Sequence, residues 1–299
     1  MKKTILSIAM MALAMGMNSC SNDIESVGTS SQYITVSTEI GNMTRVTTNN
    51  DIQSFTDGDQ ISIYAWTGDS AVAPAASDRV VNNAINTLNS SKWTAAPQML
   101  WKNTTVKHYF IGIYPKTETS VKDLTDGDYT FDVSKQEQSD LLVATNLKGL
   151  TSEQNPVLLT FKHMMAKLQV SLTFRNQWGG TPTVKSVMLK DAATTAKVNY
   201  LTQTVTASTP SGDIALPPVK TNETYTATSI VIPQTGVKSI VIRIGDKDYT
   251  YTNPDGIKLE SGKITNVSLI VGRDEITLGE VSINSWENGS TIQGGEAQE

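Results

Sequence analysis

Short apolar runs that alternate with polar positions dominate the chain, and turn-forming residues separate them. The runs are rich in β-branched and aromatic residues, while glycine, proline, asparagine and aspartate stand between them. This pattern is typical of β-strands joined by turns, and a helical period is nearly absent. The clearest predicted strands are residues 60–66, 108–115, 129–134, 156–163, 166–174, 184–191, 226–233, 238–252, 263–272 and 275–286. Many short strands without crossover helices predict an all-β fold of antiparallel β-sandwiches.

One segment indicates how the chain divides. The run "HMMAKLQVSLTF" joins two strand-like stretches with almost no loop between them. A boundary near Met165 gives two β-sandwich domains, residues 46–165 and 166–299, each of ordinary domain size. Residues 67–107 contain few strand signals apart from "RVVNNAINTL". We therefore expect them to form mainly a long loop with a short helix or strand.

Two local patterns predict tight turns. In Lys238–Thr252, alternating isoleucines precede "GDKD" and alternating tyrosines follow it, which predicts a β-hairpin. The sequence "TDGD" occurs at Thr56–Asp59 and at Thr125–Asp128, each time before a predicted strand. Neither copy has the further oxygen ligands or the closing glutamate of a calcium loop. Both are therefore predicted as turns with the glycine in the left-handed region.

The last predicted strand changes phase in its middle. Ile276 and Leu278 share one face, whereas Val281 and Ile283 fall on the opposite parity after Gly279. A one-residue slip of this kind either exchanges the faces of a strand or marks a β-bulge. Two short strand segments with a joint would give this pattern, and so would one last strand with a bulge.

The N-terminus carries an export signal. Lys2 and Lys3 precede an almost continuous apolar run, Ile5–Met17, which is too short and wrongly flanked to span a membrane. Residues 1–19 are therefore predicted to be a signal peptide. Cys20, the only cysteine, lies at the expected cleavage point. The stretch resembles a bacterial lipoprotein signal, which implies that Cys20 is lipidated and that its acyl chains hold the protein stably on the outer membrane.

Composition argues against several functions. The formal net charge is −5 and there is no basic patch, so nucleic acid is not an expected partner. The two histidines, His108 and His163, lie in separate predicted strands and are interpreted as structural residues. The sequence has no nucleophile-elbow, phosphate-binding, zinc-protease or dinucleotide motif, and nothing in it favours a particular pair of carboxylates. We therefore expect no enzyme activity, no cofactor and no metal.

One short motif indicates a modification. Residues Asp69–Ala71 read "DSA" within the predicted long loop. This tripeptide resembles an O-glycosylation acceptor of some surface anaerobes, which makes Ser70 a candidate glycosylation site.

The order of several segments resembles a known family. A lipoprotein signal is followed by a strand that ends in "TR", then by "FTDGDQISIYAW", "NNAINTLNSSKW", "HYFIGIYP", "DLLVAT", "VLLTFKHMMAKLQVSL" and "VSINSWENG". In this order they resemble the fimbrillin family, the pilus subunits of Gram-negative anaerobes. The resemblance covers nearly the whole chain. It implies two transthyretin-like β-sandwich domains, export as an outer membrane lipoprotein to the cell surface, and assembly with other fimbrial subunits into a homo- or heteropolymer.

The resemblance gives a meaning to an isolated arginine. Arg45 is the only lysine or arginine between Lys3 and Arg79. In the family, an Arg-specific protease cuts after an arginine that follows the first strand. Cleavage of the Arg45–Val46 bond would release residues 20–45, the lipid tether and first strand, as a propeptide. The other interpretation is that Arg45 is a charge in an ordinary turn.

The first strand has one face that is apolar enough to complete a sheet. In "QYITVSTEI" the side chains on that face are Ile34, Val36, Thr38 and Ile40. Removal of the strand would leave an open sheet edge that accepts another strand. By resemblance, the strand that enters is expected near the C-terminus of a neighbouring subunit, in residues 275–286. Its candidate apolar side chains are Ile276, Leu278, Val281 and Ile283.

Two functions are therefore compared. The first is a structural or adhesive subunit of cell-surface fimbriae that is cleaved after Arg45 and assembled by donor-strand completion. The alternative is a monomeric surface lipoprotein that binds glycan or protein ligands. An aromatic content of 6% is modest for a carbohydrate-binding surface, and the resemblance favours the fimbrial subunit.

Overall fold

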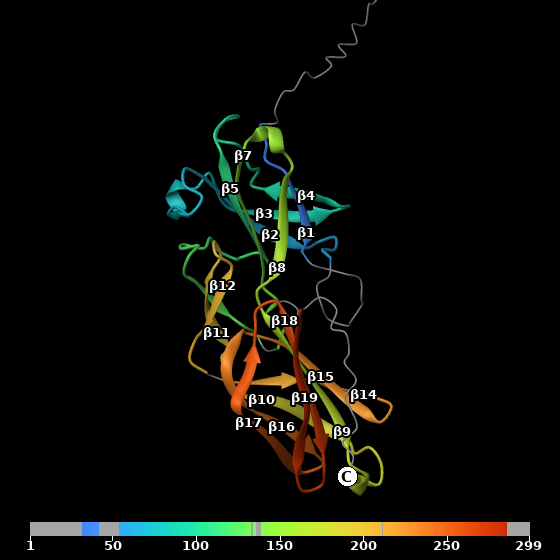
Figure 1. Cartoon of the computed structure of the whole chain (residues 1–299). Helices are drawn as coiled ribbons and strands as arrows, with labels where there is room; N and C mark the ends of the chain where they lie inside the picture. The colour runs from blue at the N-terminus through green and yellow to red at the C-terminus, as the bar shows by residue number, and fades with distance from the viewer. Residues whose placement is uncertain (1–31, 42–53, 133, 136–138, 211, 286–299) are drawn as a thin grey trace, which may run out of the picture. The chain divides into compact units, whose positions relative to one another are not determined.

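Strands form most of the described chain, as the alternating pattern predicts. The computed structural model describes residues 32–41, 54–132, 134–135, 139–210 and 212–285, which all lie in one compact unit, Ser31–Glu299 (Figure 1). These residues form four sheets, and the helices among them are short 3₁₀ turns. No helix in this part of the chain is long and apolar enough to cross a membrane. The predicted all-β fold is confirmed.

The first sheet has seven strands in the order β1-β8-β7-β5-β2-β3-β4. Its strands are β1 (Val36–Ile40), β2 (Gln60–Thr67), β3 (Val81–Asn89), β4 (Lys92–Ala96), β5 (His108–Tyr114), β7 (Leu142–Leu150) and β8 (Val157–His163). All neighbours in this sheet are antiparallel except β1 and β8, which run parallel. β1 therefore stands at one end of the sheet and differs from the other strands in direction.

Two further sheets enclose a separate core. One has the order β14-β15-β9-β18-β19 and the other β13-β10-β16-β17. The strands are β9 (Ala166–Phe174), β10 (Val184–Ala192), β13 (Gly212–Leu216), β14 (Pro218–Thr221), β15 (Thr224–Val231), β16 (Gln234–Ile244), β17 (Lys247–Leu259), β18 (Lys263–Val271) and β19 (Ile276–Ser285). Leu168 and Val170 of β9 share this core with Ile240 and Ile242 of β16. The arrangement is a β-sandwich, as predicted.

A small sheet combines strands from distant parts of the chain. Its strands are β6 (Gly127–Thr130), β11 (Thr195–Asn199) and β12 (Thr204–Ala207). Buried Ala196 and Val198 share a hydrophobic core with Tyr64 and Trp66 of β2. Ile63 of β2 belongs instead to the core inside the first sheet, so β2 is covered on both faces. Strands from both predicted domains thus pack together, and the boundary between the domains stays a prediction.

Residues 67–107 differ from the predicted long loop. They hold a 3₁₀ turn at Ala76–Asp78 and a β-hairpin made of β3 and β4. Ser90 and Ser91, which join these strands, have φ values of 48° and 65°, as a type I′ turn requires at both central residues. The prediction of a long loop is wrong, because this turn lacks the usual asparagine and glycine and because β3 carries asparagine and threonine between its apolar residues.

The predicted turns have two outcomes. The hairpin of β16 and β17 is confirmed, with Gly245 at a φ of 59°. In the first "TDGD", Gly58 has the predicted left-handed conformation, with a φ of 96°. In the second, the prediction is wrong, because Gly127 begins β6 and is not left-handed. A Cβ atom at Gly127 would lie 2.5 Å from the ring of Tyr200, so the second glycine provides space for an aromatic ring.

A buried histidine–aspartate pair lies at the end of β8. His163 Nδ1 is 2.8 Å from Asp140 Oδ2, and the two side chains are 6% and 0% exposed. His163 thus has the structural role predicted for it. A buried pair depends strongly on both partners, because removal of one leaves the other polar group in a medium of low dielectric constant.

We expect Asp140→Asn to lower the free energy of unfolding by about 3–5 kcal/mol, because it removes the charged partner of buried His163. Asp246→Asn is the control, since the pair of Asp246 with Lys185 is exposed, and it should change that free energy by less than about 1 kcal/mol. Urea denaturation measures both variants. Equal losses in the two variants would contradict the importance of the buried pair.

Candidate functional site

The segment Gln32–Gly41 lies along the end of the first sheet. Within it, β1 runs parallel to β8, in a register that places Val36 beside Val157. At the far end of the segment, the Gly41 N–H donates to the Phe161 carbonyl at 2.8 Å. β8 thus forms one flank of this segment from Val36 to Gly41.

The other flank of the segment is also hydrogen-bonded near its start. The Ile34 N–H donates to the carbonyl of Met99 at 3.0 Å, and the Trp101 N–H donates to the carbonyl of Gln32 at 3.2 Å. Backbone bonds to two separate partners therefore hold the segment. A strand of this kind cannot leave without exposing N–H and C=O groups on both flanks.

The side chains of the segment alternate as the sequence predicts. Ile34 and Val36 are 2% and 6% exposed and belong to the core of the first sheet. Thr38 and Ile40 are half-buried on the same side. Tyr33, on the opposite side, is exposed. The first strand thus has the face that could complete a sheet, while its excision remains a proposal.

Several predicted processing residues lie outside the described residues. They are Cys20, Arg45 and Val46. Gly41 is the last described residue before the Arg45–Val46 bond, and Ser54 is the first one after it.

Side chains from distant residues also bind the segment. Asn155 Oδ1 accepts from the Thr35 N–H at 2.9 Å, and Asn155 Nδ2 donates to the Tyr33 carbonyl at 3.2 Å. Thr160 Oγ1 donates to Glu39 Oε1 at 2.6 Å. Sequence reasoning missed these contacts, because a lone asparagine or threonine some 120 residues away carries no signal of its partner.

An aromatic cluster lies beside the C-terminal half of β1. Trp93 Nε1 donates to Thr38 Oγ1 at 2.9 Å. The ring of Phe55 makes edge-on contacts with Trp93, Tyr114 and Phe161, with centroid distances of 5.2–5.3 Å. Such contacts fix the orientation of the indole ring, so its N–H points at the position of Thr38.

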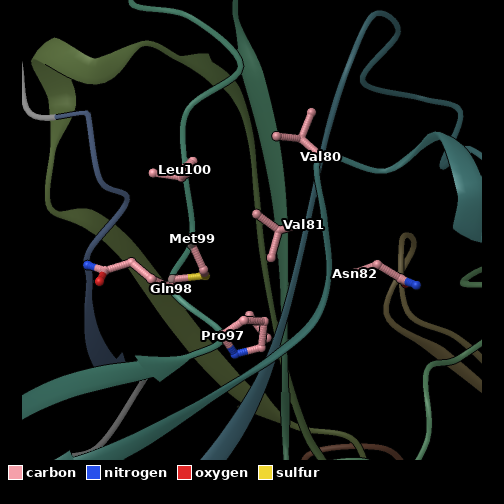
Figure 2. Close-up of a pocket in the computed structure, with 8 residues that line it drawn as sticks. Val80, Val81, Asn82, Pro97, Gln98, Met99 and Leu100 are labelled. Atoms are coloured by element: carbon pink, nitrogen blue, oxygen red, sulfur yellow. The ribbon is translucent and has the colours of Figure 1, made fainter.

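The cavity near this site is small and lacks charged side chains. Figure 2 shows the residues that line it, and its volume is about 170 Å³. They are Val80, Val81, Asn82, Ala84, Pro97, Gln98, Met99 and Leu100. Sites for drug-sized ligands are usually of about 300–1,000 Å³ and contain convergent polar groups. Among the described residues, moreover, no group of three or more histidine, cysteine, aspartate or glutamate side chains could hold a metal ion.

His108 holds the loop that binds the start of the segment. Its side chain is fully buried, Nε2 accepts from the Lys102 N–H at 3.0 Å, and Nδ1 lies 2.8 Å from the carbonyl of Val106. One nitrogen accepts and the other donates, so the imidazole is neutral. Burial lowers the pKa of His108 below its usual value. The predicted structural role of His108 is confirmed, and it supports the stretch that contains Met99 and Trp101.

Among the described strands, β19 lies at the edge of the second sandwich and pairs with β18 alone. Its register shifts by one residue at Gly279, so the phase change in the sequence is a β-bulge in one continuous strand. After the bulge, Val281 lies opposite Val267 and Ile283 lies opposite Thr265. Both partners on β18 are fully buried, so Val281 and Ile283 project from the core side of the sheet.

The apolar side chains of β19 are nevertheless poorly covered. Leu278, Val281 and Ile283 are 46%, 40% and 37% exposed, whereas Ile276 packs against the core. An edge strand extends beyond the facing sheet, and its inward side chains then reach solvent. β19 thus offers aliphatic side chains together with a backbone edge that pairs with no other described strand.

Ser70 lies in a surface turn after β2. The Trp66 Nε1–H donates to the carbonyl of Asp69 at 2.8 Å, and Asp69 Oδ1 accepts from the Ala71 N–H at 2.8 Å. Ser70 is half-exposed, and its neighbour Val72 is largely exposed. The turn is therefore fixed by hydrogen bonds and faces solvent.

Comparison with known proteins identifies the family. The sequence matches the family model described as fimbrillin-like over residues 44–286. The chain therefore belongs to the fimbrillin-like family, and the resemblance predicted from the order of its segments is confirmed. A search of curated proteins found no match.

Solved structures share the fold. The chain is similar to a proposed cell adhesion protein from Bacteroides ovatus, with 20% identity, a TM-score of 0.64, and coverage of 86% of this chain and 99% of that one. It is similar to another from Bacteroides uniformis, with 15% identity, a TM-score of 0.61, and coverage of 86% and 100%. A fimbrial protein from Bacteroides vulgatus has 16% identity, a TM-score of 0.53, and coverage of 84% and 99%. The TM-scores of these three structures show that they share a common fold with this chain.

Family membership settles the class of function. The chain matches the fimbrillin-like family model over residues 44–286, so the predicted class, a subunit of cell-surface fimbriae, is confirmed. A subunit of this kind works at the cell surface and in association with other subunits.

We expect the stability of the protein to fall as the pH drops below about 6.5, the usual pKa of histidine. The pKa of His108 is lowered in the folded chain, so the unfolded chain takes up the proton first. The stabilisation is complete above the unfolded pKa and is lost as the pH falls toward the folded one, by at most about 1.4 kcal/mol per pH unit.

Urea denaturation at several pH values measures this dependence. His108→Gln keeps an acceptor for the Lys102 N–H but does not titrate, so its stability should fall less steeply between about pH 7 and pH 5. The same slope in both proteins would show that His108 does not titrate on unfolding.

Proposed function

We propose that this fimbrial subunit is exported as an outer membrane lipoprotein and assembles by strand completion at the place of β1. Cleavage after Arg45 removes the first strand, and the site then binds a strand of a neighbouring subunit. The observation that carries the proposal is the position of β1, which stands at the end of its sheet and is the strand nearest Arg45 in sequence.

The position of β1 makes it removable. The other six strands of the first sheet remain hydrogen-bonded to one another without it. The loss is nevertheless costly, because burial of an aliphatic side chain stabilises by about 1.5–3 kcal/mol, and both Ile34 and Val36 would go. The open site would therefore bind a new strand that restores the backbone bonds and fills the two buried places.

Processing would also change the location of the protein. Lipidated Cys20 lies in the released segment, residues 20–45, so one cut separates the subunit from its anchor. Arg45 is the sole arginine in that segment. An Arg-specific protease at the cell surface would thus couple release from the outer membrane to assembly.

The strand that enters is proposed to be β19. It lies at an edge, pairs with a single neighbour among the described strands, and exposes aliphatic side chains on its core side. An exposed edge strand of this kind can pair with another chain, which promotes aggregation of a monomer but supports assembly of a polymer.

The decisive experiment compares the wild type with Arg45→Ala in cells. We expect N-terminal sequencing of the wild type to give a mature start at Val46. The variant should keep an acylated Cys20 and remain in the membrane fraction as a monomer. Native gel electrophoresis should show no polymer of it.

Two results would contradict this scheme. Normal assembly of Arg45→Ala would show that excision at this bond is not the trigger. An acylated Cys20 as the sole wild-type N-terminus, on a monomeric protein, would instead support the alternative of a surface lipoprotein that binds glycan or protein ligands.

We also propose that Ser70 is O-glycosylated. The support is its place in an exposed, hydrogen-bonded turn with the residues "DSA". Intact-mass measurement of protein from its native host should show a glycan on the wild type that is missing from Ser70→Ala. Equal masses, apart from the serine-to-alanine difference, would refute the modification.

A further inference from the structure

The core-facing side of β1 contains one polar residue, Thr38, which is hydrogen-bonded to another side chain of the sheet. Thr38 Oγ1 accepts from Trp93 Nε1 at 2.9 Å. The edge-on contact with Phe55, at 5.3 Å, holds the indole ring in place. Both Trp93 and Thr38 are half-buried, so a strand without an acceptor at this place would leave the indole N–H without a protein partner.

The place occupied by the first strand therefore has a defined order of side-chain types. Counting along the strand in steps of two, it takes an aliphatic side chain at Ile34, another at Val36 and a hydroxyl at Thr38. The first two places are buried, and the third faces one hydrogen-bond donor, Trp93 Nε1.

One half of β19 reproduces this pattern. Val281, Ile283 and Ser285 have the same spacing and carry the same two aliphatic side chains in reversed order, followed by a hydroxyl. Exchanges of this kind keep the total volume, which cores tolerate well. The half before the bulge does not match, because Ile276 and Leu278 are followed by Glu280, and a carboxylate is costly in a half-buried place.

We propose that Trp93 selects a hydroxyl in the incoming strand, and that Val281, Ile283 and Ser285 of a second copy replace Ile34, Val36 and Thr38. The inference rests on the strand-completion function proposed above. The bulge at Gly279 shifts the register of the strand by one residue. The segment that enters therefore begins after Gly279, where the alternation set by Ile276 and Leu278 stops.

This assignment fixes a direction and a register. β1 runs parallel to β8, with Ser37 beside Leu158. In the same direction, Asn284 of the second copy takes the place of Ser37 and lies beside Leu158. In-register neighbours on adjacent strands have Cα atoms about 5 Å apart, which suits a disulfide.

The first test measures assembly of the purified protein after cleavage at Arg45 by an Arg-specific protease. Ser285→Ala and Trp93→Phe should each raise the concentration needed for half-assembly by about 3- to 10-fold, the effect of one net hydrogen bond. The double variant should be no worse than either single variant, and Ser285→Thr should assemble like the wild type.

The controls separate the hydroxyl from other effects. Ser282→Ala removes a serine from the opposite face of the same strand, and this variant should assemble like the wild type. Trp93→Phe keeps an aromatic ring against Phe55, and its melting temperature before cleavage shows whether it folds. Wild-type behaviour of Ser285→Ala overturns this inference and leaves strand completion standing, whereas a cleaved wild type that stays monomeric overturns both.

The second test reads the register directly. In protein cleaved at Arg45, Leu158→Cys combined with Asn284→Cys should give disulfide-linked ladders under mild oxidation. Cys20, the only native cysteine, is absent from that protein. Leu158→Cys with Ser282→Cys lies two residues off register and should give few links. Equal or stronger linking in this second pair overturns the register.

Discussion

Backbone groups at the edge of a sheet need partners, and the structure depends on how β1 meets that need. Residues 32–41 bond to β8 on one flank and to the stretch around Met99 on the other. Ile34 and Val36 then close the core that the rest of the first sheet surrounds. Because an unpaired N–H or C=O group is costly when it is buried, the backbone bonds of this segment are essential to the closure of the sheet.

The second sandwich has the complementary problem. β19 completes its sheet on one side only, and its aliphatic side chains reach solvent at the rim of the core. The core of the first sheet thus needs the side chains of Ile34 and Val36, whereas the aliphatic side chains of β19 are only partly buried in their own sandwich. Between them, β2 is buried on both faces and packs against β11, so the framework that carries the two features is itself well packed.

Sequence patterns predicted most of what is local. Strands such as β2, β5, β8 and β9, the β16–β17 hairpin, the inward face of β1 and the phase change at Gly279 all follow from spacings of two residues. β7 and the short strands β11 to β14 were not predicted. The patterns failed where a rarer local solution or a distant partner decides the structure. Two serines in a left-handed turn hid the β3–β4 hairpin, and Gly127 serves the ring of Tyr200, more than 70 residues away.

The side-chain contacts that hold the first strand also lay beyond sequence reasoning. Asn155 and Trp93 bind the segment Gln32–Gly41 through side chains that are 120 and 55 residues away from their partners, Thr35 and Thr38. A tryptophan in a predicted strand reads only as an aromatic residue, because its hydrogen-bond partner depends on how the whole sheet closes. The residues of the site are visible in the sequence, but their pairing is a product of the fold.

The parallel alignment of β1 and β8 has a mechanical consequence. Five successive residues of the two strands lie side by side, and the interstrand hydrogen bonds of a parallel pair are spread evenly along it. A pull along the axis of the strand in this place stretches those bonds together, whereas a pull across the axis would open them one by one. A joint built this way resists tension along one direction, which is the load that shear flow puts on a thin surface filament.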